Sequence, residues 1–169
     1  ISKKYNNKID IVTFDLENEK EIEKGFKIIQ SLNKPINILV NNAGINQISL
    51  FQMTTLKLFR SVFEINFFSV VNLTQKILKL MIKNDYSKVI NVSSNAATLS
   101  DIGRSAYAPS KAALISLTEV LSKELGNFKI NINAIAPGLV KTDMMNSLPS
   151  IVIEERSEEH TSELQSRET

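Results

Sequence analysis

Cysteine and tryptophan are absent from this chain of 169 residues, and glycine and proline occur only five and four times. The lack of cysteine excludes disulfide bonds and thiolate metal sites. No apolar run is long enough to span a bilayer. Charges of both signs are scattered along the sequence, and the formal net charge is only +2. This pattern predicts a chain that binds neither nucleic acid nor a membrane.

The only histidine, His160, lies in the final stretch RSEEHTSELQSRET, residues 156–169. This stretch has no apolar periodicity, so its composition argues against a packed element. It also resembles the in-frame translation of a sequencing adapter. We interpret residues 156–169 as a non-native or disordered tail and residues 1–155 as one partial domain. Without His160 the chain offers no histidine triad or zinc site, and we expect no metal.

Segments with strand and helix periodicity alternate along the chain. Short apolar, β-branched runs predict buried strands at residues 9–16, 36–40, 88–94 and 129–136. Amphipathic patterns predict helices over residues 18–32, in two segments of 55–83, and from the sequence YAPSK to a C-terminal glycine, Gly126. Strand–helix alternation with continuous apolar strands implies an α/β fold, a doubly wound parallel sheet with helices on both faces.

Distinctive small and polar residues follow every predicted strand. Asp15 ends the first, Asn41–Gly44 follow the second, Ser93 and Ser94 the third, and Pro137 and Gly138 the fourth. Each has an ordinary interpretation as a turn or a helix cap. In open parallel sheets, however, ligands bind beyond the carboxyl ends of the strands. Four such groups at one edge predict a binding site there.

Tyr107 and Lys111 begin the helix that contains YAPSK. They are four residues apart, so they share one face of the helix, and Pro109 between them fits only a first turn. A tyrosine serves as an acid or base at neutral pH only with help, because its unperturbed pKa is about 10. A neighbouring ammonium lowers that pKa by favouring the phenolate. The alternative is two unrelated surface side chains.

Taken together, these motifs resemble the short-chain dehydrogenase/reductase family, of the 3-oxoacyl-carrier-protein reductase-like kind. The resemblance covers roughly residues 9–148. It includes NNAG at Asn41–Gly44, the asparagine of EINFFS at Asn66, the SS…YxxSK block, and PGxVxTDM from Pro137 to Met144. The family's serine lies thirteen residues before its tyrosine, which selects Ser94 over Ser93.

The resemblance implies a Rossmann-type fold and assigns roles to residues. Tyr107 is the acid or base, Lys111 tunes it and holds the nicotinamide ribose, and Ser94 hydrogen-bonds the substrate oxygen. Asn66 holds a water of a proton relay, with a buried structural amide as the alternative. The expected cofactor is NADP or NAD, with no preference indicated. Its expected binding residues are Asp15, Asn42, Ala43, Gly44, Tyr107, Lys111, Pro137, Gly138, Val140 and Thr142, with a helix N-cap as the alternative for Thr142.

The chain also departs from the family pattern. The family's TGxxxGxG loop after its first strand is absent, as are its last helix and strand. We therefore expect the chain to be truncated at both ends, with the first βαβ unit upstream of Ile1 and the final elements after Glu155.

The resemblance predicts an oxidoreductase that transfers hydride between NAD(P)(H) and a carbonyl or secondary alcohol, for example a 3-oxoacyl thioester. The alternatives are a non-catalytic dinucleotide-binding or scaffold protein, and an inactive fragment of the enzyme. The expected partners are a small-molecule substrate and further copies of the chain, in a cytoplasmic homodimer or homotetramer. The helix from Glu64, apolar almost all round at its start, and the helix from Ala106 are the expected contact face.

Overall fold

A computed structural model of the chain describes residues 8–99 and 101–138. The chain divides into two compact units, Ile1–Ala136 and Pro137–Thr169, and of the second unit only Pro137 and Gly138 are described. The predicted boundary between residues 155 and 156 lies outside the described residues. The fold below is that of the first unit.

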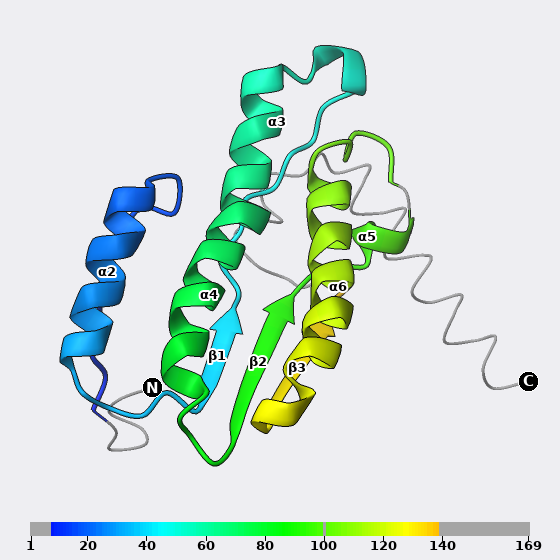
Figure 1. Cartoon of the computed structure of the whole chain (residues 1–169). Helices are drawn as coiled ribbons and strands as arrows, with labels where there is room; N and C mark the ends of the chain where they lie inside the picture. The colour runs from blue at the N-terminus through cyan, green and yellow to red at the C-terminus, as the bar shows by residue number, and fades with distance from the viewer. Residues whose placement is uncertain (1–7, 100, 139–169) are drawn as a thin grey trace, which may run out of the picture. The chain divides into compact units, whose positions relative to one another are not determined.

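Three parallel strands form the sheet of the first unit. They are β1 (Ile38–Asn41), β2 (Ser87–Val92) and β3 (Ile130–Ile135), in the order β1-β2-β3. Val40 pairs with Ile90, and Asn91 pairs with Ala134. Figure 1 shows the three strands running in one direction beside the long helices. The predicted parallel sheet is confirmed, as are three of the four predicted strands.

Helices account for most of the remaining described residues. They are α2 (Glu19–Ser31), α3 (Leu56–Phe63), the π-helix η2 (Glu64–Phe68), α4 (Ser69–Met81), α5 (Ala96–Leu99) and α6 (Tyr107–Glu124), with short 3-10 turns η1 (Phe51–Met53) and η3 (Gly126–Phe128). Gly126 follows the C-cap of α6 as predicted, but the left-handed residue that leads into β3 is Lys129, with φ of 54°. Among these described helices, none combines the length and hydropathy needed to cross a membrane.

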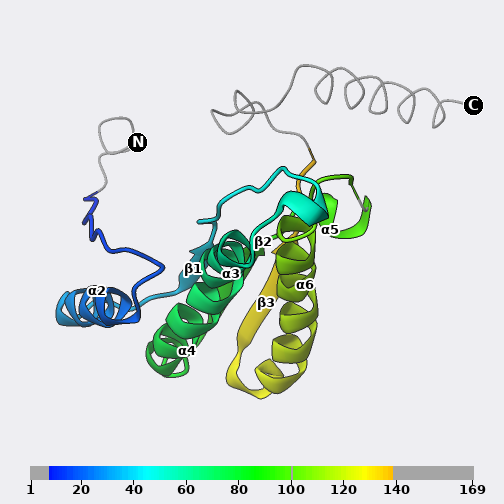
Figure 2. The ribbon, with the colours of Figure 1, turned by 90° about the horizontal axis from the view of Figure 1, so that it is seen from above.

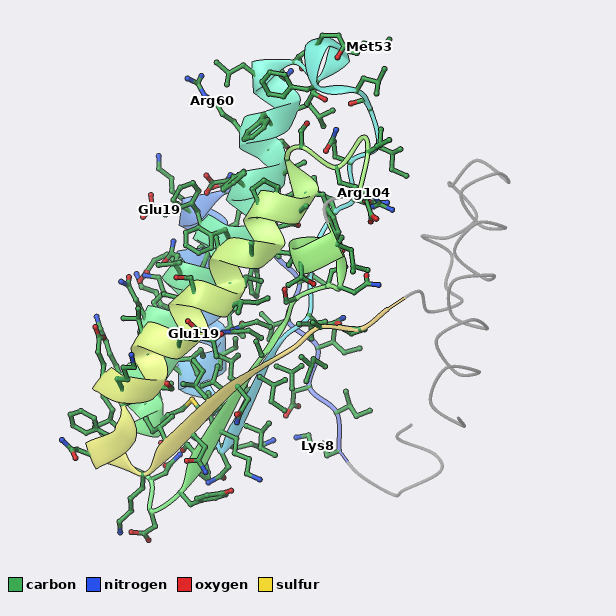
Figure 3. All side chains as sticks on the ribbon, turned by 90° about the vertical axis from the view of Figure 1, so that its right-hand side faces the viewer. Lys8, Glu19, Met53, Arg60, Arg104 and Glu119 are labelled. Atoms are coloured by element: carbon green, nitrogen blue, oxygen red, sulfur yellow. The ribbon has the colours of Figure 1, made fainter. Side chains whose placement is uncertain are left out.

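An apolar cluster joins α4 and α6 to one face of the sheet. Val89 of β2 is fully buried, and Ile130 and Ile132 of β3 are nearly so. Together with side chains from the last turns of both helices they form the apolar cluster, which comprises Ile77, Leu78, Met81, Val89, Leu125, Ile130 and Ile132. Figure 3 shows both helices on the same side of the strands. Burial of this kind contributes about 1.5–3 kcal/mol for each large side chain.

The opposite face of the sheet is mixed. Its residues alternate with those of the apolar cluster: Ile38, Val40 and Ile135 remain about half exposed, and the polar side chains of Lys88, Asn131 and Asn133 lie on the same face. Apolar side chains on both faces of a strand are typical of parallel sheets that are covered on both sides. The described helices cover one of these faces.

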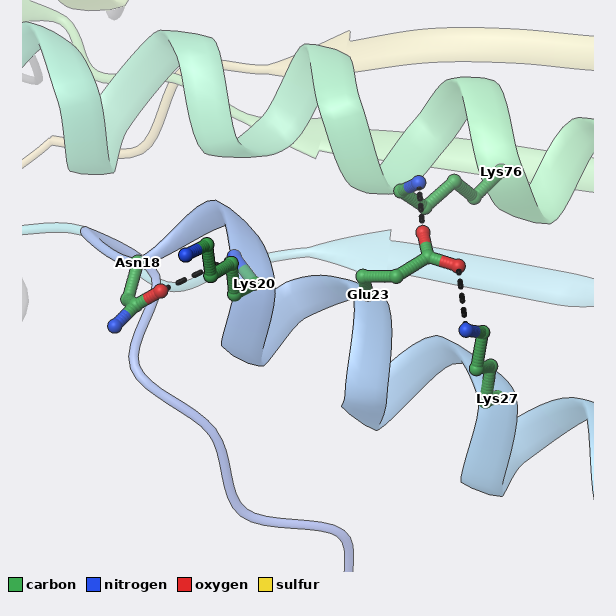
Figure 4. Close-up of polar contacts among 5 residues, drawn as sticks. All are labelled: Asn18, Lys20, Glu23, Lys27 and Lys76. Carbon is green, nitrogen blue, oxygen red and sulfur yellow. Dashed lines mark hydrogen bonds and ion pairs between the residues drawn. The ribbon is translucent and has the colours of Figure 1, made fainter.

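Helix α2 packs beside α4 (Figures 1 and 2). Asn18 caps its N-terminus by accepting hydrogen bonds from the backbone N–H groups of Lys20 and Glu21, at 3.1 and 3.3 Å. Glu23 forms ion pairs with Lys76 of α4 and with Lys27 one turn later (Figure 4). These cations lower the pKa of Glu23, with the hydrogen bond from Lys76 as the largest cause.

The prediction of a strand at residues 9–16 is wrong for this structure. Residues 8–15 have no regular structure, and a turn follows at residues 16 and 17. A strand is stabilised by hydrogen bonds to a neighbouring strand, and this segment pairs with none of β1, β2 and β3. Sequence pattern alone does not supply that neighbour.

Candidate active site

The carboxyl ends of the strands and the first turn of α6 form one end of the fold. The residues after β1 run through Gly44 to Gln47, those after β2 include Ser93 and Ser94, and α6 begins at Tyr107. The predicted binding site is at this end, and most of the residues predicted for it lie here.

Gly44, Asn66 and Lys111 meet although they are far apart in the sequence. A Cβ at position 44 would lie 3.1 Å from Asn66 Oδ1 and 3.2 Å from Lys111 Nζ. Such contacts are tighter than ordinary van der Waals distances, so glycine allows the other two side chains to approach. Gly44 was predicted as a cofactor contact, and the close approach of Asn66 and Lys111 is a second reason for glycine at this position.

Asn66 lies fully buried in η2, and its amide is satisfied by protein groups. Its Oδ1 accepts a hydrogen bond from the Ile45 N–H at 2.8 Å, and its Nδ2 donates to Ile45 O and Ser110 Oγ, both at 3.0 Å. These contacts are those of a buried structural amide, the alternative noted above. The relay role stays a prediction. A π-helical turn at this position fits the frequent use of such turns at functional sites.

Tyr107 and Lys111 lie on the first turns of α6, as their spacing predicts. Lys111 Nζ is 6.0 Å from the centre of the Tyr107 ring and donates a hydrogen bond to Val92 O at 2.8 Å. Lys111 is 4% exposed, and burial lowers the pKa of its ammonium. Tyr107 is partly exposed, and among the described residues no side chain hydrogen-bonds its hydroxyl.

The two serines after β2 have different surroundings. Ser93 is buried, and its hydroxyl donates to Lys111 O at 2.8 Å. Ser94 is half-buried, and its Oγ accepts a hydrogen bond from the Ala96 N–H at 3.2 Å, at the start of α5. Ser93 therefore anchors α6, whereas Ser94 is the more accessible hydroxyl. Its contact with Ala96 also matches the alternative interpretation of a helix cap.

Gln47 is a positioning residue that the sequence analysis missed. The N-cap of α6, Ala106, has no side chain that can cap the helix. Gln47 Oε1 accepts hydrogen bonds from the N–H groups of Ala106 and Tyr107, at 3.1 and 3.4 Å. Its Nε2 donates to Ser49 and Thr54. A buried residue 60 positions before Tyr107 thus caps the helix that carries the tyrosine.

Arg104 is the second residue that the sequence analysis missed. It is 7% exposed, its Nη1 donates to Asn46 Oδ1, and its Cζ lies 5.3 Å from the centre of the Tyr107 ring. A lone arginine three residues before the tyrosine gives no periodic signal. Its partner Asn46 is 58 residues away.

A chain of hydrogen bonds between buried polar side chains joins the strands to α4 and α6 next to the site. Asn41 at the end of β1 donates to Thr74 of α4 and to Asn91 of β2, at 3.0 and 2.8 Å. Asn91 donates in turn to Thr118 of α6 at 2.8 Å. We call seven of the buried polar residues at this end the polar cluster: Asn41, Asn66, Thr74, Asn91, Ser110, Lys111 and Thr118. Asn41, the first asparagine of NNAG, therefore has a structural role, because it joins β1 to β2 and to α4.

The other predicted cofactor residues are less constrained by the described contacts. Asp15 is exposed, and its carboxylate accepts a hydrogen bond from the Glu17 N–H at 2.9 Å. Asn42 and Ala43 are exposed after β1. Pro137 and Gly138 directly follow the first unit and belong to the second. Val140 and Thr142 lie outside the described residues.

Two further observations concern alternative sites. In the described part of the chain, no group of three or more His, Asp or Glu side chains is placed to hold a metal ion. A cavity of about 620 Å³ is lined by residues at the amino ends of β1 and β2 and in the segment before β2: Pro35, Asn37, Ile38, Lys83, Asn84, Asp85, Tyr86 and Lys88. None of the predicted catalytic residues lines it.

Residues 1–151 match the short chain dehydrogenase family. The chain is 38% identical over 144 residues to the 3-oxoacyl-[acyl-carrier-protein] reductase FabG of Aquifex aeolicus, covering 85% of this chain and 58% of that protein. It spans between 46% and 60% of the length of eight curated relatives that it matches.

Solved structures show the same fold. A short-chain dehydrogenase from Streptomyces avermitilis superposes with a TM-score of 0.78 at 31% identity, covering 85% of this chain and 53% of that chain. A 4-hydroxyisoleucine dehydrogenase complexed with NADH and succinate superposes with a TM-score of 0.73 at 28% identity, covering 79% and 64%. The Rossmann-type architecture expected from the sequence is thereby confirmed.

Proposed function

The chain belongs to the short chain dehydrogenase family, and on that premise we propose that the natural protein transfers hydride between a nicotinamide dinucleotide and a carbonyl or secondary alcohol. One observation carries the proposal: the ammonium of Lys111 is buried 6.0 Å from the centre of the Tyr107 ring. A buried cation beside a phenol is what a tyrosine acid or base requires.

The residues present fit a nicotinamide dinucleotide. An ammonium carries three donors, and Lys111 uses one of them on Val92 O, so two remain for ribose hydroxyls. Gly44 allows that ammonium to approach the backbone, because a Cβ at position 44 would lie 3.2 Å from Lys111 Nζ. The NADH complex of 4-hydroxyisoleucine dehydrogenase supports a nicotinamide cofactor, and either NAD or NADP suits the residues. Asp15, Asn42, Ala43, Gly44, Pro137, Gly138, Val140 and Thr142 are the proposed further contacts.

The chain's own residues supply the proton chemistry. In the reductive direction the Tyr107 hydroxyl gives its proton to the carbonyl oxygen, and in the oxidative direction the phenolate takes a proton from the alcohol. The bound cofactor supplies or accepts the hydride. Lys111 stabilises the phenolate by its charge. Ser94 donates a hydrogen bond to the same substrate oxygen as negative charge develops there, and Asn66 is the proposed holder of a relay water.

The substrate that we propose is a 3-oxoacyl thioester. Support comes from the named activities of several relatives, which are 3-oxoacyl-[acyl-carrier-protein] reductases from different bacteria at 30–38% identity. Another relative, carbonyl reductase family member 4 of Xenopus laevis, is 34% identical over 134 residues. A carbonyl is the common feature of these substrates, so the carbonyl is the firmer part of the proposal.

We also propose that η2 and α6 form a contact face between copies of the chain in a cytoplasmic homodimer or homotetramer. Phe68 at the end of η2 is 50% exposed and packs edge-on against Phe67. Replacing Phe68 with Asp should weaken self-association in sedimentation, because a charge on an apolar contact face is costly to desolvate. A natural protein that sediments as a monomer at micromolar concentration would contradict this proposal.

The function is tested by following NADPH and NADH fluorescence with a panel of 3-oxoacyl thioesters, simple ketones and secondary alcohols. We expect oxidation of one dinucleotide with a 3-oxoacyl thioester, and loss of that activity in Tyr107→Phe. Cofactor binding without turnover on any carbonyl would favour a binding or scaffold protein. If the protein shows no cofactor binding and no turnover, the proposal is contradicted.

A further inference from the structure

Tyr107 has two cations beside its ring. Lys111 belongs to the YxxSK motif, but the guanidinium of Arg104 is closer, with its Cζ 5.3 Å from the ring centre against 6.0 Å for Lys111 Nζ. Arginine is always charged in proteins, and a cation within about 6 Å of an aromatic ring is attracted to its face. The interaction strengthens when the hydroxyl ionises, because the ring system then carries a full negative charge.

Arg104 is held in this position by protein contacts. The side chain is 7% exposed, and its guanidinium donates to Asn46 Oδ1. Its backbone forms an isolated parallel bridge with Ser49 and accepts a hydrogen bond from the Ala108 N–H at 2.9 Å, in the first turn of α6. Figure 3 places Arg104 in the loop that leads into α6. A buried, hydrogen-bonded guanidinium keeps its distance from the ring far better than a mobile surface side chain.

The pKa of Arg104 also reflects the charge interaction with Tyr107. Burial lowers the pKa of Arg104, and the charge interaction with Tyr107 raises it again in part. The geometry places the two groups close enough for this interaction, with Arg104 Cζ 5.3 Å from the centre of the Tyr107 ring.

We propose that Arg104, held by Asn46, is a positioning residue for Tyr107 that orients the ring and stabilises its phenolate together with Lys111. The contacts between Arg104 and Tyr107 are independent of the proposed function. Only the catalytic role of the phenolate rests on it. The charged residues on elements packed against α6 are Lys57 and Arg60 of α3, Glu64 of η2 and Lys88 of β2, and Asp101 lies in the loop before Arg104. Within the described residues, only Arg104 and Lys111 place a cation over the Tyr107 ring.

The chain allows a direct test without cofactor or turnover. It contains no tryptophan and three tyrosines, so tyrosinate absorbance near 295 nm is free of indole background. The measurement is the initial absorbance after a stopped-flow pH jump, because ionisation precedes any unfolding at alkaline pH. Subtracting the same titration in a Tyr107→Phe background isolates Tyr107 from the other two tyrosines.

We expect Arg104→Gln to move the Tyr107 midpoint up by roughly one pH unit, the lower end of the effect of a nearby opposite charge. Arg104→Lys should restore most of the wild-type midpoint because it keeps the charge. The matched control is Arg60→Gln, which removes the same charge from an exposed position on α3 that projects away from the strands (Figure 3) and should leave the midpoint unchanged.

Equal midpoints in Arg104→Gln and Arg60→Gln would overturn the proposal, as would a shift in Arg104→Lys as large as in Arg104→Gln. If circular dichroism shows that Arg104→Gln does not fold, Asn46→Ala is the deciding variant, because it keeps the charge of Arg104 but releases its guanidinium. An upward shift of the Tyr107 midpoint in Asn46→Ala, smaller than the shift expected for Arg104→Gln, supports the proposal. An unchanged midpoint overturns it. If both variants unfold, Arg104 serves folding alone and the proposal fails. Every one of these outcomes leaves the test of hydride transfer untouched.

Discussion

The apolar cluster and the polar cluster lie along the same two helices, α4 and α6, and behave in opposite ways. In the apolar cluster Met81 and Val89 are fully buried and form no polar contacts through their side chains. In the polar cluster Asn66 and Ser110 are equally buried, but each depends on a specific hydrogen-bond partner. Burial is therefore no guide to role in this protein. The two clusters differ in what a mutation would remove.

The difference follows from the cost of burying polar groups. A buried apolar side chain stabilises the fold with little dependence on the identity of its neighbours. A buried amide or ammonium contributes little net stability and is costly when a partner is lost. The polar cluster lies where the strands end and the predicted catalytic residues begin. We infer that it is retained to hold those residues, and that the apolar cluster supplies much of the stability.

The largest expected effect is a loss of turnover without a loss of stability, at Tyr107 in the candidate active site. Tyr107→Phe should lower turnover of the natural protein by about 10²–10⁴-fold, the usual loss when a general acid or base is removed. The ring still packs, so the unfolding temperature and the cofactor affinity should stay close to those of wild type. Steady-state kinetics and thermal unfolding provide the measurements. A variant that retains more than about a tenth of the wild-type rate would exclude tyrosine as the acid.

In the apolar cluster we expect a mutation to lower stability. Met81→Ala should lower the free energy of unfolding by about 2–5 kcal/mol, because it leaves a cavity at a fully buried position. The control is Ile82→Ala, at the neighbouring residue, which is 42% exposed and should cost about 0.5 kcal/mol. Urea unfolding measures both. Equal losses in the two variants would mean that the apolar cluster does not carry the stability assigned to it.

A smaller effect is expected in the chain of buried hydrogen bonds next to the site. Asn91→Ala removes hydrogen bonds to Asn41 and Thr118 and should cost about 1–3 kcal/mol, the penalty for buried polar groups that lose a partner. Asn133→Ala, an exposed asparagine on the neighbouring strand β3, is the matched control and should change stability by less than about 0.5 kcal/mol. If the two variants unfold at the same urea concentration, these hydrogen bonds contribute no stability.

The last prediction concerns a pH trend. Burial lowers the pKa of Lys111 below its ordinary value of 10.5. Between the lowered pKa and 10.5 the unfolded chain binds a proton that the folded chain does not, so wild-type stability rises with pH in that window. Below the window the penalty for the buried charge is complete. The stability of Lys111→Met relative to wild type should therefore be greatest below the window and decrease as pH rises through it.

Urea unfolding at a series of pH values measures this trend. Lys123→Met, an exposed lysine on the same helix, is the control and should show no such convergence with wild type. A stability difference between Lys111→Met and wild type that is constant with pH would contradict the assigned burial effect.

Much of the fold was predictable because its signals are local. The run of β-branched residues at 88–94 and the amphipathic repeat of 18–32 each specify their own element, and both are found within two residues of the expected bounds. The strand expected at residues 9–16 shows the limit. Its composition favours an extended chain, but a strand also needs a neighbour, and the structure provides none for this segment.

The site was predictable where spacing along one helix sets geometry and unpredictable where distant segments meet. The four-residue spacing of Tyr107 and Lys111 placed both on one side of α6. Gln47 and Arg104 carry no such signal, because their roles depend on the loop after β1 reaching the start of α6. The one available hint was that Ala106, the N-cap of α6, has no side chain that can accept a hydrogen bond, so the first N–H groups of the helix need an acceptor from elsewhere in the fold.

The sequence by itself determined the alternation of strands and helices, the parallel sheet and the tyrosine–lysine pair, because each is encoded by side chains within a few residues of one another. Tertiary structure alone decided that Gly44 makes room for Asn66 and Lys111, that Ser93 anchors α6 while Ser94 stays accessible, and that a second cation lies over Tyr107. Those contacts join residues that are 18 to 67 positions apart, or depend on how a loop is held by such contacts. They form only when burial of the apolar cluster brings the strands and helices together, and no local pattern of residues records that approach.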